Sequence, residues 1–372
     1  MPSLTDETPG SQSPALSPPR ARRQFFPQLD GLRAAAVFLV LMFHVNIDGM
    51  RMPAGLAIPF SCGWIGVDAF FVLSGFLITK ILLDYKPGPR AYGVFVLRRT
   101  LRTWPLYFAT LLAAYLTLHI SGTGERVNWI QHLFFLQNYA PDWVASSLGA
   151  TWSLCIEEHF YIVWPLLIFL LPRRLLAWTM SGVFLSLPLL RFWGLHHDFT
   201  HKQLYSETQF HLDGLAAGSL VALLVFYYAV RPRTLKWIAY ACLFVGTSCS
   251  LLGFWKGWDV VRGDNIIFGF TFLAIAFAGL LMILLDGGGP VLGRLFGFGP
   301  VRYVGRISYG IYLLHMGIFA LLGRLALQRF FGEWSESWAF SIPLRIGVTI
   351  GVAALSYRFF ESPILRFKDG VR

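Results

Sequence analysis

The chain has 372 residues, a formal net charge of +11, 55% hydrophobic residues and 14% charged residues. Because soluble domains carry about 25% charged residues, this composition excludes a water-soluble protein and, over most of the length, an intrinsically disordered one. The basic residues lie between apolar runs and form no aromatic-interleaved patch, so they do not indicate nucleic-acid binding. Four scattered cysteines have neither metal-ligand nor disulfide spacing. The class that remains is a membrane protein.

The chain begins with a polar segment, residues 1–23, that is rich in Ser, Pro and Thr and ends in a basic stretch. Such a composition buries too little apolar surface to order itself, so we expect a disordered cytoplasmic tail. No small-residue cleavage site follows the basic stretch, which argues against a cleavable signal peptide. We expect a membrane domain over residues 24–366 and a short cytoplasmic tail over residues 367–372.

Apolar stretches of about the length that a bilayer requires recur through the membrane domain. They predict an all-α, polytopic membrane helix bundle of about ten transmembrane helices. The stretch 127–140 is also apolar, and the sequence leaves open whether it enters the membrane or lies only at the interface. The predicted spans are 34–47, 64–83, 103–120, 151–171, 177–190, 209–229, 237–254, 265–285, 305–323 and 342–360. Most Lys and Arg residues fall in alternate loops, which predicts a multi-pass protein of the inner (plasma) membrane with both termini cytoplasmic.

Ionisable residues inside these spans are costly and mark candidate functional sites. Arg33 begins the first span on the cytoplasmic side, and His44 follows eleven residues later, about 16 Å along a helix. Asp68 and Glu157 enter their spans from outside, so we expect them in the same outer layer as His44. There His44 would act as a general base that a carboxylate orients. Alternatively, His44 only forms a hydrogen bond between helices. Glu158 neighbours Glu157, so only one of them points into a given cavity.

A basic cluster precedes the third span and predicts a cytoplasmic binding site. Arginines at one mouth suit a ligand with several phosphates, because each guanidinium forks onto phosphate oxygens. The alternatives are anchoring to lipid headgroups and, for Arg33, a helix-end ion pair with Asp30. The expected donor-binding residues are Arg33, Arg98, Arg99, Arg102 and Arg306.

Later segments carry fewer signals. Ser308, Tyr312 and His315 stand at i, i+4 and i+7 of one span, which indicates a polar cavity wall, although aromatic packing explains the tyrosine nearly as well. Asp213 begins another span near the outer layer. The polar loop with His196, His197 and His201 lacks a carboxylate at suitable spacing, so we predict no metal site.

Six blocks of the sequence, in this order, resemble the acyltransferase family 3 membrane proteins. They are LDGLR (29–33) with His44, GVDAFFVLSGFLIT (66–79), RRTLRTWP (98–105), TWSLCIEEHFY (151–161), RISYGIYLLH (306–315) and YRFFESP (357–363). The resemblance extends over residues 25 to 366. With these blocks included, the residues expected to line the cavity besides the catalytic ones are Ser74, Ser153, Glu158, Tyr161, Asp213, Ser308, Tyr312 and His315.

The resemblance implies an enzyme that takes an acyl group from cytoplasmic acyl-CoA, with acetyl-CoA the expected form, and transfers it to a hydroxyl of a carbohydrate or glycoside at the outer face. It assigns acyl-CoA handling to Arg33 and catalysis to His44, and it implies no permanently bound cofactor. His159 stands where the family usually has Gln, and His211 where Arg is common, so contacts with the acceptor remain open. Many relatives carry an extracellular hydrolase-like domain after the last span. This chain ends at Arg372, and we expect no such domain here.

The resulting hypothesis places the acyl-CoA phosphates on Arg98, Arg99 and Arg102, with help from Arg33. His44, balanced by Asp68 or Glu157, then deprotonates the acceptor hydroxyl, which attacks the thioester. An acyl-histidine intermediate is the alternative route. Two other classes remain open from sequence: a transporter or flippase of an acidic or sugar-linked substrate, and a non-catalytic scaffold for polysaccharide synthesis. Membrane lipids are expected partners in each case.

Overall fold

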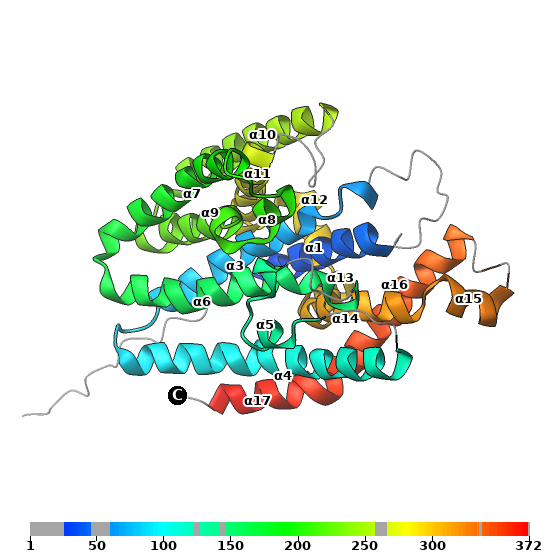
Figure 1. The fold of residues 1–372 in the computed structure, drawn as a ribbon. Coiled ribbons are helices and arrows are strands. Elements are labelled where there is room, and N and C mark those ends of the chain that lie inside the picture. The colour runs from blue at the N-terminus through cyan, green and yellow to red at the C-terminus, as the bar shows by residue number, and fades with distance from the viewer. Residues whose placement is uncertain are drawn as a thin grey trace, which may run out of the picture.

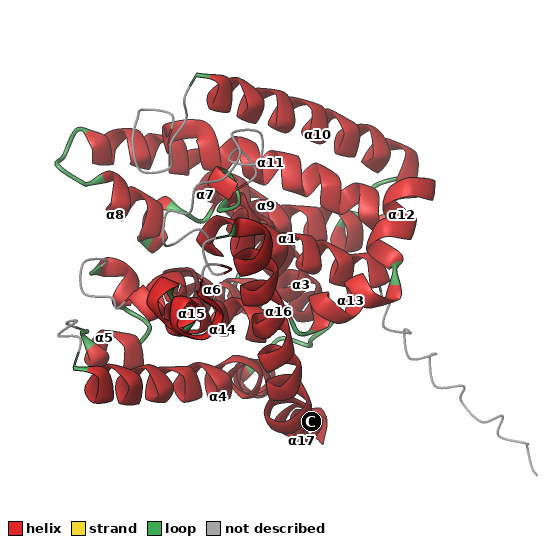
Figure 2. Cartoon of the chain, turned by 90° about the vertical axis from the view of Figure 1, so that its right-hand side faces the viewer, coloured by secondary structure: helices red, strands yellow, loops and turns green. Residues whose placement is uncertain are grey.

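The fold is that of a computed structural model, which describes residues 26–45, 60–122, 127–140, 146–256, 266–332, 334 and 337–370. The predicted tail 1–23 lies outside the described residues, as do residues 371–372. Figure 1 shows helices in several layers, and every regular element of the described chain is helical (Figure 2). The all-α prediction is therefore confirmed.

Long helices occupy all ten of the predicted apolar segments. The long elements are α1 (Pro27–Val45), α3 (Ile65–Leu83), α4 (Pro89–Ser121), α6 (Trp152–Leu170), α7 (Arg173–Leu195), α9 (Asp213–Ala222), α10 (Pro232–Trp255), α11 (Ile266–Leu285), α14 (Ser308–Leu321) and α16 (Trp338–Ser356). The short ones are α5 (Trp129–Leu133), α8 (His201–Ser206), α12 (Gly289–Gly297), α13 (Gly299–Arg306), α15 (Arg324–Phe331) and α17 (Ser362–Gly370). Two π-helical turns, η5 (Leu223–Tyr227) and η7 (Tyr357–Glu361), extend α9 and α16.

Seven of the described helices are long and apolar enough to cross a membrane, and the bent pair of α13 and α14 would make an eighth. The helix axes of that pair meet at 68°. The segment Asp213–Tyr227 is apolar but shorter, and α4 carries the basic cluster in its first half. A polytopic membrane bundle is thus confirmed, while the number ten stays a prediction.

Helix α1 lies in the middle of the bundle, where it packs against α3, α12, α13 and α14. Figures 1 and 2 place α10 at one edge and α4 with α17 at the opposite edge. Close helix contacts depend on glycine residues, which have no side chain. A Cβ at Gly305 of α13 would lie 1.7 Å from the carbonyl oxygen of Asp30. A Cβ at Gly218 of α9 would lie 2.0 Å from the carbonyl oxygen of Val72. The first of these contacts brings α13 against the start of α1.

Two predicted spans have different boundaries in the structure. The first begins at Pro27, seven residues before the predicted start at 34, so Asp30 and Arg33 lie inside α1. The third begins at Pro89 and runs for 33 residues, which makes the whole basic cluster part of α4. The apolar stretch 127–140 contains α5 and a 3-10 turn, Gln137–Tyr139, instead of a span.

Candidate active site

A cleft of about 350 Å³ opens where α1, α4, α13 and the end of α16 meet. We call it the arginine cleft, and its lining residues are Asp30, Arg33, Arg102, Arg302, Arg306, Tyr309, Tyr357, Glu361 and Leu365. It brings together three of the predicted donor-binding arginines, Arg33, Arg102 and Arg306. Arg302, which was not among the expected donor-binding residues, supplies a fourth guanidinium. A concave site with four guanidiniums matches a ligand that carries several phosphate groups.

Asp30 connects two of these arginines at the edge of the cleft. Its Oδ1 lies 3.5 Å from Nη1 of Arg33, and its Oδ2 lies 4.0 Å from Nε of Arg306. The helix-end ion pair between Asp30 and Arg33 is therefore present. Because both contacts are long and Arg306 is half exposed, they leave most donor groups of the two guanidiniums available to a ligand.

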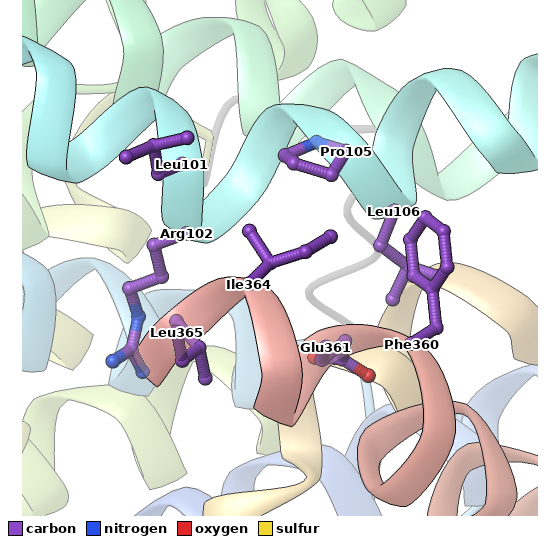
Figure 3. Close-up of a pocket in the computed structure, with 8 residues that line it drawn as sticks. All are labelled: Leu101, Arg102, Pro105, Leu106, Phe360, Glu361, Ile364 and Leu365. Carbon is purple, nitrogen blue, oxygen red and sulfur yellow. The ribbon is translucent and has the colours of Figure 1, made fainter. Parts of the chain in front are cut away.

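Arg102 and Glu361 also line a second, narrow pocket, which lies between α4 and the segment η7–α17 and shares Leu365 with the arginine cleft. Figure 3 shows Arg102 hanging from α4 beside Leu365, while Ile364 separates it from Glu361. Glu361 is the last residue of η7, and a π-helical turn shifts the residues after it relative to a regular helix. Glu361 was not among the residues predicted for the site, although it belongs to the last of the six sequence blocks. The sequence feature that could have indicated Glu361 is that it is the only acidic residue in the last block, YRFFESP (357–363).

Arg98 and Arg99, also predicted to bind the donor, do not line the arginine cleft. Nη1 of Arg98 donates to the hydroxyl of Tyr85 at 3.0 Å. Arg99 donates to the hydroxyl of Tyr161 and lies 3.6 Å from a carboxylate oxygen of Glu157. Successive residues of a helix point about 100° apart, which is why these neighbours have different surroundings. The predicted arginine cluster is thus divided.

Glu157 belongs to a half-buried network around Arg99, not to the neighbourhood of His44. It accepts hydrogen bonds from Ser74 at 2.7 Å and from Tyr161 at 2.9 Å. The prediction that the carboxylates and the arginines occupy separate layers is wrong here. Arg99 lies ten residues into α4, about 15 Å from its start, because that helix begins earlier than predicted.

Glu158, which was predicted to line the cavity, anchors α6 to α4 instead. It is buried and accepts hydrogen bonds from the hydroxyl of Thr103 at 3.0 Å and from the indole of Trp104 at 3.2 Å. The hydroxyl of Tyr309, which lines the arginine cleft, donates to the backbone oxygen of Thr103 at 2.6 Å. This network therefore lies directly behind the cleft.

His44 lies in the last turn of α1 and meets His315 of α14. Nδ1 of His44 is 2.9 Å from the carbonyl oxygen of Val40 and 3.3 Å from Nε2 of His315, and the ring centroids are 4.9 Å apart. Since a carbonyl oxygen only accepts, Nδ1 of His44 carries the proton. Its Nε2 has no hydrogen-bond partner among the described residues. The His44 side chain is partly buried, and a neutral imidazole with an unpartnered Nε2 is the form that a general base requires.

Asp68 does not contact His44, contrary to its predicted role as the orienting carboxylate. Its Oδ1 lies 3.1 Å from Nε2 of His211, whose Nδ1 donates to the backbone oxygen of Tyr205 at 2.6 Å. Both side chains of this pair are almost fully buried. Asp68 faces α9, because Gly214 lets that helix approach the backbone of Asp68. The depth of Asp68 along its span did not predict its partner, because the direction in which a side chain points decides which residue it contacts.

Asp213 was predicted to line the cavity, and the structure places it in a buried ion pair instead. Its two carboxylate oxygens accept from Nη1 and Nη2 of Arg191 at 2.6 and 3.0 Å, and Thr271 donates to it at 2.6 Å. Arg191, expected in an outer loop, is fully buried in α7. A fully paired, desolvated carboxylate of this kind holds helices together and is closed to a substrate.

The remaining predicted cavity residues lie around α14. The hydroxyl of Tyr312 donates to the backbone oxygen of Ala150 at 2.9 Å and lies 2.5 Å from Oγ of Ser153. Ser308 is buried in the first turn of α14. Tyr312 thus links α14 to the segment before α6, one turn from His315. Among the described residues, no group of His, Cys, Asp or Glu is arranged to hold a metal ion.

Comparison with known proteins gives consistent matches along the chain. A model of a family described as an acyltransferase domain matches residues 26–358. The chain is 29% identical to the peptidoglycan O-acetyltransferase OatA of Listeria monocytogenes, in an alignment that covers 93% of this chain and 56% of the relative. It is 27% identical to the O-acetyltransferase OatA of Staphylococcus aureus, with 92% and 57% covered. The chain therefore spans about half the length of these curated relatives. No solved structure matches it significantly.

Proposed function

The chain belongs to acyltransferase family 3, and from this premise we propose that it is a membrane O-acyltransferase that moves an acetyl group from acetyl-CoA to a carbohydrate hydroxyl. Relatives named for O-acetylation, one of them for that of peptidoglycan, support the reaction and favour a peptidoglycan-type acceptor. The observation that carries the proposal is the arrangement on α1. This helix contributes Arg33 to the arginine cleft and, eleven residues later, holds His44 with a bare Nε2.

The arginine cleft is the proposed donor site. Coenzyme A carries three phosphate groups, and four guanidiniums offer each of them at least one partner. Arg33 and His44 are about 16 Å apart along α1, a distance that the extended pantetheine arm can bridge. The donor nucleotide would therefore remain in the cleft while its thioester reaches the imidazole.

His44 is the proposed general base. Its Nε2 takes the proton of the acceptor hydroxyl, the alkoxide oxygen bonds to the thioester carbonyl carbon, and the carbon–sulfur bond then breaks. The thiolate of coenzyme A takes the proton back from the imidazolium, so that free coenzyme A and an O-acetyl ester leave. An acetyl-histidine intermediate on the same Nε2 remains the alternative route.

The proposed orientation places the arginine cleft on the cytoplasmic side with both termini. Leu365 of α17 and Arg33 near the start of α1 line the same cleft, so the two ends of the described chain belong to one side of the bundle. The concentration of Lys and Arg in the loops on this side supports a cytoplasmic assignment.

The test uses the purified protein in detergent with radiolabelled acetyl-CoA and a soluble peptidoglycan disaccharide. We expect labelled O-acetyl disaccharide from the wild type, and a loss of kcat of about 10²- to 10⁴-fold in His44→Ala, because no other group replaces the base. The control is His132→Gln: this buried histidine of α5 also bonds a carbonyl oxygen four residues earlier, at 2.9 Å. Burial lowers the pKa of His132, so it is neutral like His44 but stands apart from the site. Full turnover by His44→Ala would refute the assignment, and binding of acetyl-CoA without any transfer would favour a transporter.

A further inference from the structure

The side chain that touches His44 is another histidine. His315 is fully buried in α14, and its Nε2 lies 3.3 Å from Nδ1 of His44. The expected carboxylates are engaged elsewhere: Asp68 pairs with His211, and Glu157 pairs with Ser74 and Tyr161. A base–orienter pair normally consists of an imidazole and the group that receives its second N–H. In this protein the group that receives the second N–H of His44 is the neutral imidazole of His315.

The surrounding carbonyl groups fix the proton on each ring. Nδ1 of His315 lies 2.5 Å from the carbonyl oxygen of Tyr312, so Nδ1 carries its proton and Nε2 has a lone pair. Nδ1 of His44 donates to Val40 and also points toward that lone pair. His315 therefore accepts from His44, and the two rings have a defined donor and acceptor.

We propose that His315 is the positioning residue of the active site, which holds the His44 ring by accepting its Nδ1–H and stabilises the imidazolium that forms when Nε2 takes the acceptor proton. The inference rests on the proposed function. The roles are not interchangeable, because both ring nitrogens of His315 are occupied and its side chain is closed to solvent. Of the two rings, only His44 retains a nitrogen without a partner among the described residues. Burial of His315 strengthens the contact, since its Nε2 is closed to solvent.

Tyr312 supports His315 from the preceding turn of α14. Its backbone oxygen receives Nδ1–H of His315, while its hydroxyl bonds to Ala150 and lies beside Ser153. The orientation of His315 is thus fixed by the helix and by the segment before α6. This arrangement keeps the lone pair of His315 directed at His44 without a charged group in the apolar bundle.

The first test compares His315→Leu with His315→Gln, using acetyl-CoA and the peptidoglycan disaccharide. Leucine removes the acceptor, and we expect kcat to fall about 10- to 100-fold while KM for either substrate changes less than about twofold. Glutamine can offer its Oε1 to Nδ1–H of His44, so its kcat should stay within about fivefold of wild type. When His44→Ala is already present, His315→Leu should cause no further loss, because His315 acts through His44. Equal losses in the two variants, or a further loss in the His44→Ala protein, would overturn the proposal.

The second test does not depend on activity. Nitrogen-15 NMR of the histidine-labelled wild-type protein in lipid, with His44→Ala and His315→Gln used for assignment, reports which nitrogen of each ring carries the proton. We expect the Nδ1–H form for both rings and a short nitrogen–nitrogen contact between them. A proton on Nε2 of His315 would overturn the proposal. Absence of acetyl transfer by the wild type, with this NMR pattern present, would refute the proposed function alone.

Discussion

Buried polar side chains in this protein are mostly paired between helices, and these pairings decide which residues can meet a substrate. Asp213 pairs with Arg191, and Asp68 pairs with His211. Glu158 accepts a hydrogen bond from α4. In a low-dielectric interior a charge without a partner is very costly, so such pairs are closed to ligands. Among the described residues, the side chains that line the arginine cleft and Nε2 of His44 are the groups best placed to meet a substrate.

The first prediction separates two arginines one turn apart on α4. Replacing Arg102 by Ala should raise KM for acetyl-CoA about 10- to 100-fold, because a hydrogen bond to a charged group contributes about 1.5 to 3 kcal/mol. Arg98→Ala is the matched control: its side chain bonds Tyr85 and does not line the cleft, so its KM should change less than about threefold. Steady-state kinetics with the disaccharide in excess measure both. A larger effect from Arg98 than from Arg102 would contradict the donor site described here.

Sequence alone identified the residue types but not their partners. Arg33, Arg102, Arg306 and His44 were expected at the site, and the structure places the three arginines in one cleft and His44 beside His315. The roles expected of Asp68 and Glu157 as partners of His44 were wrong. Counting residues gives the depth of a side chain along a helix, but helix rotation and packing decide what it faces.

At the level of elements, the contact between α1 and α13 shapes the arginine cleft. Gly305 lies against the backbone of Asp30, and Arg302 and Arg306 stand on the same short helix. On the other side, η7 brings Glu361 to the cleft from the end of α16. The cleft therefore depends on a close helix contact and on one irregular turn.

The second prediction tests that helix contact. Gly305→Ala would place a methyl group 1.7 Å from the carbonyl oxygen of Asp30, so α13 must move away from α1. We expect a destabilisation of about 1 to 3 kcal/mol and a raised KM for acetyl-CoA, because two guanidiniums move with α13. Gly299→Ala on the same helix is the control, since its methyl group would meet nothing within 4 Å. Thermal unfolding in detergent and donor kinetics give the result, and identical behaviour of the two variants would speak against the contact.

Much of the element pattern follows from sequence, because apolar runs of bilayer length are strong signals. Helices occupy every predicted segment, but the early start of α4 at Pro89 was missed. A basic, polar stretch does not resemble a span, although it continues the same helix. The π-helical turn η7 also has no pattern of its own, because one shifted hydrogen bond leaves the apolar periodicity almost unchanged.

In the whole molecule, the proposed donor site lies toward one end of α1 and the proposed base near the other end. Arg33 and Leu365 line the arginine cleft, and His44 occupies the last turn of α1. If the arginine cleft faces the cytoplasm, the acetyl group enters on one side of the membrane and the acceptor hydroxyl is acylated near the other. The central claim is this separation of the two substrates.

Sealed liposomes that contain the protein, with the disaccharide inside and radiolabelled acetyl-CoA outside, test the claim most directly. The account predicts labelled O-acetyl disaccharide inside the liposomes, in proportion to the molecules whose C-terminus faces outward, and none with His44→Ala. Acetylation only of disaccharide supplied on the same side as acetyl-CoA, or unchanged acetylation by His44→Ala, would contradict it.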